Sequence, residues 1–313
     1  MRILIMGTGG VGGYYGGLLA QQGNEVAFIA RGAHLDAIRQ EGLKVQSVHS
    51  DFTIFPANAA EDPSQLEPVD LILFCVKTYS TDESAQAIRP AVGPGTAVMS
   101  LQNGVEAAER IGKVVGPEHV IGATTWLSSA VEAPGLIRQV SQFRRIVFGE
   151  LDGNRTERIQ SIYEVLNQTG ITVEVSEDIH KVLWTKLVFI AAVSSVGSLT
   201  RLPMGDYRSI PETRSLLSSI MQEVESVARA QDIRLDENVV QNWLQFIDDA
   251  APQIKPSMQL DVETGRRTEL ESMVGVIGRK GRELGVPTPI ADFVYASLLP
   301  VEAKARNASA PPP

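Results

Sequence analysis

The first half of the chain alternates short apolar runs with amphipathic segments, which predicts strands alternating with helices. The runs at 2–6 and 71–76 are almost continuously apolar, as expected for parallel strands that are covered on both faces. The predicted strands of this half are 2–6, 25–30, 71–76 and 96–101, and the predicted helices are 11–22, 33–41, 82–88 and 105–114. This alternation favours a doubly wound α/β sheet.

The pattern changes in the second half of the chain. Shorter strand-like pieces are predicted at 120–126, 136–140, 145–148 and 172–175, and helical periodicity then follows at 181–199, 210–231, 236–250, 265–284 and 290–303. The segment 181–199 is apolar on almost every side, which predicts a centrally buried helix. We therefore expect a Rossmann-type domain over 1–175, an all-helical domain over 176–305 and a flexible tail over 306–313.

Composition narrows the function without identifying it. The 313 residues are 43% hydrophobic and 21% charged, which fits two folded domains, and the net charge of -9 argues against nucleic acid as a partner. Neither a run of 18 apolar residues nor a secretory signal is found, so we expect a cytoplasmic protein with no membrane partner. The one cysteine, Cys75, excludes an internal disulfide and is expected to be a small buried hydrophobe. The four histidines show no metal spacing, so no metal site is predicted.

A glycine-rich loop follows the first predicted strand directly and begins the first predicted helix. It fits the dinucleotide-binding pattern G-x-G-x-x-G with Gly7, Thr8, Gly9, Gly10, Val11 and Gly12. Gly7 would permit the tight turn, Gly9 the approach of a pyrophosphate, and Gly12 the close packing of helix on sheet. The pyrophosphate would lie on the free N–H groups of the helix N-terminus.

The residue that ends the second strand indicates which dinucleotide is bound. NAD-dependent enzymes usually place a carboxylate there, but this chain has Arg31. We expect no acidic residue near Arg31. A guanidinium suits a 2′-phosphate, so NADPH is predicted as the cofactor rather than NADH. Lys77 and Asn103 follow two further strands at their carboxyl ends, where ligands of such sheets bind.

Lys186 is the one lysine within the most apolar part of the helix predicted at 181–199. Burial would lower its pKa toward a range useful for proton transfer, although a lysine with its ammonium in water would give the same pattern. Glu269 lies in a later helical stretch, and by itself it is as compatible with an exposed carboxylate as with a site residue.

Together these motifs resemble the ketopantoate reductase (2-dehydropantoate 2-reductase) family over nearly the whole chain. The resemblance rests on the glycine loop, Arg31, Lys77, and the segments 102–104, 183–187 and 268–271. It implies that Lys186 is the general acid, that Asn103 holds cofactor and substrate in a cleft between the domains, and that Glu269 contacts the nicotinamide side. It also implies cofactor contacts by Arg31, Lys77 and the backbone of Ser128, and a substrate-carboxylate contact by Ser257.

The chain departs from the family on the helix that carries the lysine. The family typically has asparagines four and eight residues after the lysine and again ten residues later, where this chain has Ile190, Ser194 and Met204. Loss of amides that bind a hydroxyl or keto oxygen should discriminate against the family's substrate. Ile190 and Ser194 are nevertheless carried over as substrate-facing positions.

The sequence therefore predicts NADPH-dependent reduction of ketopantoate to pantoate in pantothenate biosynthesis, with a small 2-oxo acid as the partner molecule. A reductase of a less polar 2-oxo acid or of an imine is the alternative within the same class. A non-catalytic NADPH-binding sensor is the alternative of another class, although a sensor needs no proton donor. A homodimer is compatible with the sequence, which does not fix the oligomeric state.

Overall fold

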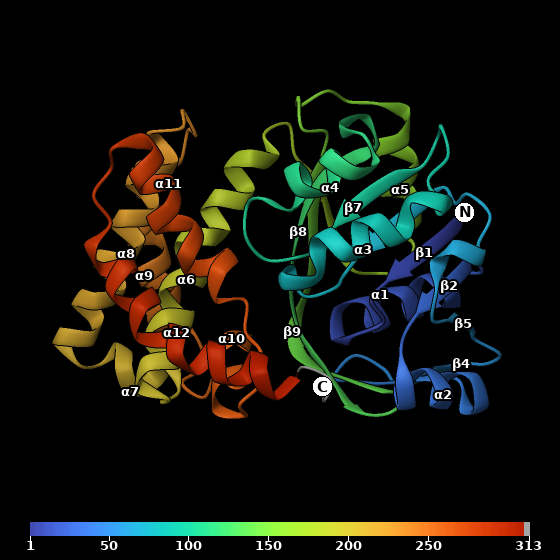
Figure 1. The fold of residues 1–313 in the computed structure, drawn as a ribbon, viewed down its shortest axis with the longest axis horizontal. Coiled ribbons are helices and arrows are strands. Elements are labelled where there is room, and N and C mark those ends of the chain that lie inside the picture. The colour runs from blue at the N-terminus through green and yellow to red at the C-terminus, as the bar shows by residue number, and fades with distance from the viewer. Residues whose placement is uncertain (310–313) are drawn as a thin grey trace. The chain divides into compact units, whose positions relative to one another are not determined.

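The computed structural model describes residues 1–309, which form two compact units. The first unit comprises Met1–Gln102 and Glu106–Ile179, and the second comprises Asn103–Val105 together with the described residues from His180 onward. In Figure 1 the first unit runs from blue to green and the second from yellow-green to red. The three residues 103–105 thus follow a strand of the first unit in sequence but make their contacts with the helical unit.

The first unit is built on one mixed sheet in the order β4-β3-β9-β8-β7-β6-β1-β2-β5, with β10 paired to β9. Its strands are β1 (Arg2–Met6), β2 (Glu25–Ile29), β3 (Leu43–Ser47), β4 (Phe52–Ile54), β5 (Asn58–Ala60), β6 (Leu71–Phe74), β7 (Ala97–Ser100), β8 (Val120–Ala133), β9 (Leu136–Gly149) and β10 (Thr172–Val175). The central strands β7, β6, β1 and β2 are parallel, and β1 lies between β6 and β2. Residues that follow β1, β2 and β6 therefore meet at one edge of the sheet.

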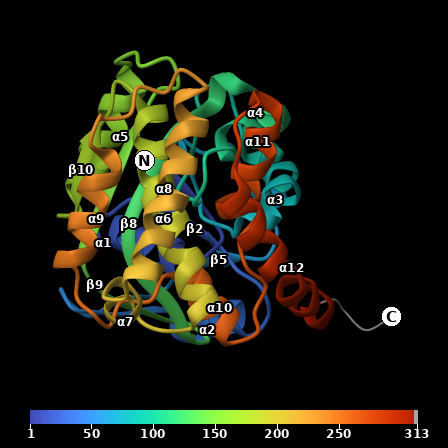
Figure 2. The same cartoon turned by 90° about the vertical axis from the view of Figure 1, so that its left-hand side faces the viewer.

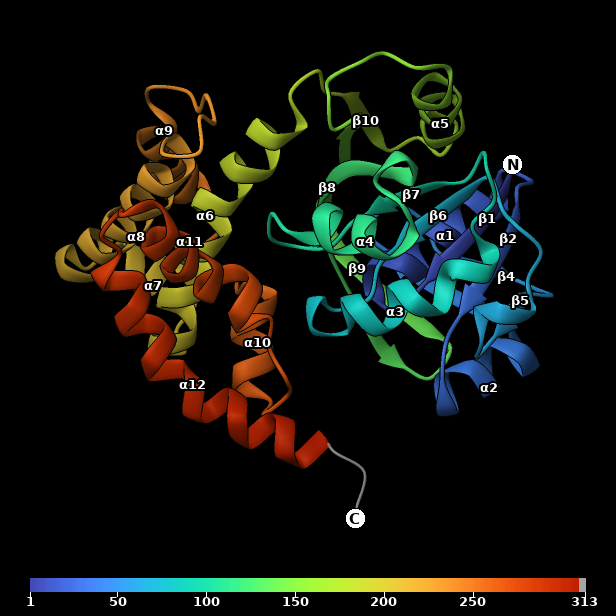
Figure 3. The ribbon, with the colours of Figure 1, turned by 45° about the horizontal axis from the view of Figure 1, so that its top comes forward.

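Helices cover both faces of the parallel strands, which explains why the strands are apolar at successive positions. Ile3 and Ile5 of β1 pack in one core with α1 and α5, whereas Leu4 and Met6 pack in another with α3 and α4. Figure 3 shows α3 and α4 side by side. The helices and 3-10 turns of this unit are α1 (Gly10–Gln21), α2 (Gly32–Glu41), η1 (Pro63–Gln65), η2 (Thr78–Ser80), α3 (Thr81–Ile88), η3 (Arg89–Ala91), α4 (Ala107–Val115), η4 (Pro117–His119) and α5 (Glu157–Asn167).

All regular elements of the second unit are helices within its described residues. Its elements are α6 (Ile179–Thr200), which begins at the last residue of the first unit, α7 (Met204–Arg208), α8 (Pro211–Arg229), α9 (Val239–Asp249), α10 (Ser257–Glu263), the π-helical turn η5 (Glu271–Gly275), α11 (Val276–Leu284) and α12 (Pro289–Ser309). Residues of α6 pack in one core with those of α8, α9, α11 and α12. Figure 2 shows α6 and α8 near the centre of this unit.

By length and hydropathy α6 is the one helix among residues 1–309 that could cross a membrane. However, 72% of its most apolar 18-residue window is buried inside the protein. The apolar residues of α6 therefore form part of the core of the second unit, as the pattern at 181–199 predicted.

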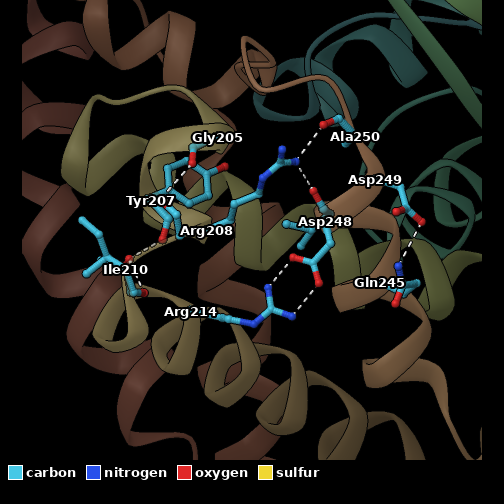
Figure 4. A network of polar contacts seen from close by, with 12 residues as sticks. Gly205, Tyr207, Arg208, Ile210, Arg214, Gln245, Asp248, Asp249 and Ala250 are labelled. Atoms are coloured by element: carbon cyan, nitrogen blue, oxygen red, sulfur yellow. Dashed lines mark hydrogen bonds and ion pairs between the residues drawn. The ribbon is translucent and has the colours of Figure 1, made fainter.

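A polar network holds α7, α8 and the end of α9 together (Figure 4). Arg214 forms a bidentate pair with Asp248, with Nη1–Oδ1 and Nη2–Oδ2 distances of 2.5 and 2.7 Å. Arg208 donates from Nη1 to the carbonyl oxygens of Ile247 and of Ala250, the latter at 2.7 Å. These carbonyls lie at the C-terminal end of α9, where a helix leaves acceptors without partners of its own.

The predicted fold class is confirmed, but several elements differ from the prediction. The pieces expected at 136–140 and 145–148 are one strand, β9, which forms a long hairpin with β8. The short strands β3, β4 and β5 and the helices α5, α7 and α10 were not predicted. The helix expected from residue 265 begins only after Glu269 and opens with a π-helical turn.

The tail expected at 306–313 also differs from the prediction. Residues 306–309 belong to α12, where alanine-rich sequence favours helix and Ala305 is 3% exposed. The remainder, 310–313, lies outside the described residues.

Candidate active site

The glycine loop between β1 and α1 has the geometry that its glycines imply. Gly7 adopts φ +97°, and a Cβ there would lie 2.8 Å from Cγ1 of Val76. A Cβ at Gly12 would lie 2.2 Å from the carbonyl oxygen of Gly7, so any side chain would push the helix off the sheet. A Cβ at Gly9, in contrast, would meet no atom within 4 Å. The loop is therefore closed toward the sheet and open on the side of Gly9.

The start of α1 fits a bound pyrophosphate. The helix begins at Gly10 and includes Val11 in its first turn, no side chain caps it at Gly9, and no acidic residue lies in that turn. The N–H groups and the positive end of the helix dipole at such a terminus favour an anion. With the open side at Gly9, these residues fit the phosphates of a dinucleotide.

Hydrogen bonds of Thr8 and His34 hold the glycine loop in place. The Thr8 N–H and hydroxyl both donate to the carbonyl oxygen of Ile29, at 2.9 Å each. His34, on α2, accepts the Gly135 N–H at Nδ1 (3.0 Å), so its Nε2 carries the proton and donates to the Thr8 carbonyl (2.8 Å). Burial lowers the pKa of His34 below its ordinary value. Sequence reasoning missed His34, because a lone histidine without metal spacing gives no signal.

Arg31 and Lys77 flank the glycine loop from the neighbouring strands. Arg31 follows β2 and precedes α2, and Lys77 follows β6 and precedes η2, so both stand at the carboxyl edge of the sheet. The expectation of no acidic residue near Arg31 is wrong, because Glu83 Oε1 of α3 lies 3.3 Å from Arg31 Nη2. The chain turns back after β6, so that Glu83 of α3 comes close to the residue that follows β2. The sequence separation of Arg31 and Glu83 gave no indication of this contact. Both side chains are about two-thirds exposed, so the pair is weak.

Ser128 lies on β8 beside the glycine loop. Ser128 is exposed, and its backbone N–H donates to Ser141 Oγ at 3.0 Å. The pairing of β8 with β9 shifts register between Leu127 and Ser129. A Cβ on Gly10 would lie 2.3 Å from the Ser129 carbonyl oxygen, which shows how closely this part of β8 approaches the loop.

Three predicted residues meet in the second unit: Asn103, Lys186 and Glu269. Lys186 Nζ donates to Asn103 Oδ1 at 3.1 Å, across 83 residues of sequence. Asn103 Nδ2 donates to Glu269 Oε2 at 3.4 Å, across 166 residues. The amide is thus oriented with its oxygen toward the cation and its nitrogen toward the carboxylate.

The cluster is largely removed from water. Lys186 is 9% exposed and Glu269 5% exposed. Burial lowers the pKa of the Lys186 ammonium to about 8, while the negative charge of Glu269 opposes that shift. A lysine with this pKa is largely protonated near pH 7 and still a competent proton donor.

Gly104 lets the backbone next to Asn103 approach the π-helical turn. It adopts φ +91°, and a Cβ there would lie 2.9 Å from the Ser272 carbonyl oxygen. Ser272 in turn donates its hydroxyl to the Glu269 carbonyl at 3.1 Å. The turn that follows Glu269 therefore packs directly behind Asn103. π-helical turns occur often at functional sites.

The predicted substrate-facing positions differ in how far they are buried. Ile190 is half-buried on α6, whereas Ser194 is fully buried and its hydroxyl contacts Met273 Sδ at 3.8 Å. Met204 is 1% exposed and lies in the apolar core. Ser257 is exposed at the first residue of α10. Ile190 and Ser257 are accessible, and Ser194 is not.

Two further observations concern residues outside this site. Burial raises the pKa of the Cys75 thiol, which packs against the sheet core. Within residues 1–309 no group of three or more His, Cys, Asp or Glu side chains is placed to hold a metal ion.

Known proteins resemble this chain over nearly its whole length. Residues 3–153 match the family described as ketopantoate reductase PanE/ApbA, and residues 178–302 match its C-terminal counterpart. A 2-dehydropantoate 2-reductase of Mesorhizobium japonicum is 29% identical, covering 95% of this chain and 96% of that protein. The crystal structure of a PanE/ApbA family ketopantoate reductase from Ralstonia eutropha JMP134 is 31% identical, with a TM-score of 0.90 over 98% of this chain and 100% of that one.

A structure of D-mandelate dehydrogenase with NADH and anilino(oxo)acetate has the same fold. It is 24% identical, with a TM-score of 0.90 over 98% of this chain and 99% of that chain.

Proposed function

Because the chain belongs to the ketopantoate reductase family, we propose that it reduces the ketone of a small 2-oxo acid with NADPH, with ketopantoate as the substrate and pantoate as the product. It is an oxidoreductase of the nicotinamide-dependent kind. Family membership favours an enzyme over the non-catalytic sensor.

The cofactor is held by the glycine loop and the ends of the neighbouring strands. Gly9 and the N-terminus of α1 would receive the pyrophosphate, and the backbone of Ser128, next to the Ser129 carbonyl that approaches Gly10, would add a contact. Arg31 and Lys77 bind the ribose 2′-phosphate, which selects NADPH over NADH. When bound, NADPH would supply the hydride for the ketone carbon.

Lys186 is the general acid. Its Nζ donates a proton to the ketone oxygen as negative charge develops there, and until that transfer the positive charge of the ammonium stabilises the developing alkoxide. Asn103 orients the ammonium through its Oδ1, and Glu269 keeps the ammonium charged despite its burial. One observation carries this proposal: a buried lysine ammonium bonded to an amide that is itself bonded to a buried carboxylate.

The substrate's carboxylate binds Ser257, and its carbonyl oxygen binds Lys186 and Asn103. Ketopantoate also carries a hydroxyl that the family binds with asparagine amides, and this chain offers Ile190 and a buried Ser194 instead. That difference supports a second candidate substrate, a less polar 2-oxo acid or an imine, for the same machinery.

Steady-state oxidation of NADPH tests the proposal. Ketopantoate is compared with 2-oxo acids of similar size that lack its hydroxyl, each with NADPH and with NADH. A higher kcat/KM for ketopantoate supports the first candidate, and a higher value for the apolar acids supports the second. Absence of turnover with ketopantoate, with these 2-oxo acids and with imines of similar size would contradict both.

A further inference from the structure

Glu302 is a buried carboxylate on α12 that lies outside the cluster of Asn103, Lys186 and Glu269. Its residue is 9% exposed, and its Oε2 accepts two hydrogen bonds of 2.7 Å from Thr268, one from the backbone N–H and one from the hydroxyl. Its Oε1 lies 3.6 Å from Nε of Arg267. A carboxylate is costly to bury, and here its hydrogen bonds come from one residue, Thr268, in the segment before η5.

Thr268 connects this carboxylate to Glu269, the next residue along the chain. The Thr268 hydroxyl oxygen also accepts the Leu270 N–H at 3.3 Å, which caps the start of the helix. The Glu269 carbonyl then accepts the Met273 N–H at 3.1 Å. Glu269 is therefore fixed on one side by the helix that it begins and on the other by Thr268.

The charge of Glu302 also suits its position. It lies at the N-terminal end of the helical segment that starts at Leu270, where the helix dipole favours a negative charge. Removal of Glu302 would leave the N–H and hydroxyl of Thr268 buried without this acceptor, since Thr268 is 5% exposed. The turn that carries Glu269 would then have to move to satisfy them.

We propose that Glu302 is a positioning residue for the reaction: by binding Thr268 it holds Glu269 against Asn103, and so keeps the charged site around Lys186 assembled. The inference rests on the proposed function for its effect on rate. Its effect on the geometry and charge of the Lys186 site does not depend on turnover. Glu302 bonds to Thr268, so in this proposal it acts through Glu269 and not on the substrate.

A purely structural role for Glu302 is the competing explanation, and the chain contains a matched control. Glu223, on α8, accepts the N–H groups of Ile290 and Ala291 at 2.8 Å each and so caps the other end of α12. Like Glu302, it is a carboxylate that binds backbone N–H groups at a helix start. Unlike those of Glu302, these hydrogen bonds of Glu223 go to the start of α12 and not to the segment that carries Glu269.

The test compares Glu302→Ala, Glu302→Gln and Glu223→Ala in the full chain, after circular dichroism has shown that each is folded. The pKa of Lys186 is measured by NMR titration of protein with 13C at the lysine ε-carbon, assigned with Lys186→Met. Steady-state kcat and KM are measured alongside it. If Glu302→Ala does not fold, Glu302→Gln and Thr268→Val provide the same comparison in milder form.

Glu302→Ala should shift the Lys186 titration to lower pH, because Glu269 then opposes the effect of burial less well. It should also lower kcat by about tenfold to a hundredfold, as misplacement by about 1 Å does. The side-chain carbonyl of Glu302→Gln can accept the same hydrogen bonds, so this variant should keep most of the Lys186 pKa and most of kcat. Glu223→Ala should change neither the Lys186 pKa nor kcat. An unshifted Lys186 titration in folded Glu302→Ala, or an equal shift in Glu223→Ala, would overturn the inference. If the titration shifts while Lys186→Met retains normal turnover, the proposed function fails and the positioning role stands.

Discussion

Lys186 and Asn103, 83 residues apart in sequence, are joined by a 3.1 Å hydrogen bond from the lysine ammonium to the amide oxygen. The amide nitrogen of Asn103 faces Glu269 in turn. The bond fixes the position of the ammonium, which is the group that we propose donates to the ketone oxygen of the substrate.

The first prediction concerns pH. Lys186 donates a proton only in its charged form, and its pKa is lowered to about 8. We therefore expect kcat/KM to be highest below about pH 8 and to fall as the pH rises through that value. In Glu269→Gln the fall should begin at a lower pH, because the charge that raises the pKa of Lys186 is gone. A pH profile of each protein measures this, and an identical alkaline limb in both would contradict the role of Glu269.

The second prediction concerns cofactor choice. Arg31→Ala should weaken NADPH binding by about 1.5 kcal/mol, or roughly tenfold, because a charge-assisted bond to phosphate is lost at an exposed site. NADH binding should change little. Calorimetry with both cofactors measures the difference.

Glu83→Gln is the matched variant for Arg31. It removes the carboxylate 3.3 Å from Arg31 Nη2 and should tighten NADPH binding by up to about fivefold, which is the range of exposed ion pairs. Equal affinities of the unmodified protein for NADH and NADPH would be incompatible with this assignment of Arg31.

Much of the fold could be predicted because its signals are local. The strand at residues 2–6 and the glycine loop after it carry their pattern within a dozen residues. The helix α5 also has such a signal, with Ile159, Ile162 and Leu166 buried at helical spacing behind the N-cap Thr156, and it was overlooked. The strands β4 and β5 have only three residues each, too few for a period to show.

The rest of the site depends on contacts that no local pattern carries. The proximity of Glu83 to Arg31 follows from the chain's return after β6, and the bond from Asn103 to Glu269 spans 166 residues. The burial of Ser194 also follows from packing, since its side chain meets Met273 from another helix. Resemblance to a family supplied the residues of the cluster, and the structure supplies their contacts.

The third prediction concerns His34, which bonds to the glycine loop. His34→Ala should destabilise the first unit by about 1–3 kcal/mol, because the Thr8 carbonyl and the Gly135 N–H lose their partner. It should also weaken NADPH binding, since the loop is held less firmly. Thermal unfolding and calorimetry measure the two effects.

The same histidine predicts a pH dependence of stability. The pKa of His34 is lowered in the folded protein, so the unfolded chain binds the proton more readily. The stability due to His34 is therefore full above its ordinary pKa of about 6.5 and is lost as the pH falls through the folded value. His34→Ala should lack this part of the acid dependence, and equal dependence in both proteins would contradict this contribution of His34 to stability.

The fourth prediction concerns the substrate. Ile190→Asn should raise kcat/KM for ketopantoate by about tenfold if the face of α6 binds the substrate hydroxyl as in the family. Ser194→Asn should instead destabilise the protein by about 1–3 kcal/mol, because it adds volume to a fully buried position. An unchanged constant in folded Ile190→Asn would mean that the substrate is held elsewhere.

The rate of Lys186→Met, with Lys181→Met as the control, tests whether Lys186 is the proton donor. Lys181 lies on the same helix, five residues earlier, and pairs with Asp236 at 2.6 Å. Lys186→Met should lower kcat by about 10²–10⁴-fold and leave the Kd for NADPH nearly unchanged, whereas Lys181→Met should leave both nearly unchanged. Near-normal kcat in folded Lys186→Met would contradict the central claim that this buried lysine is the proton donor.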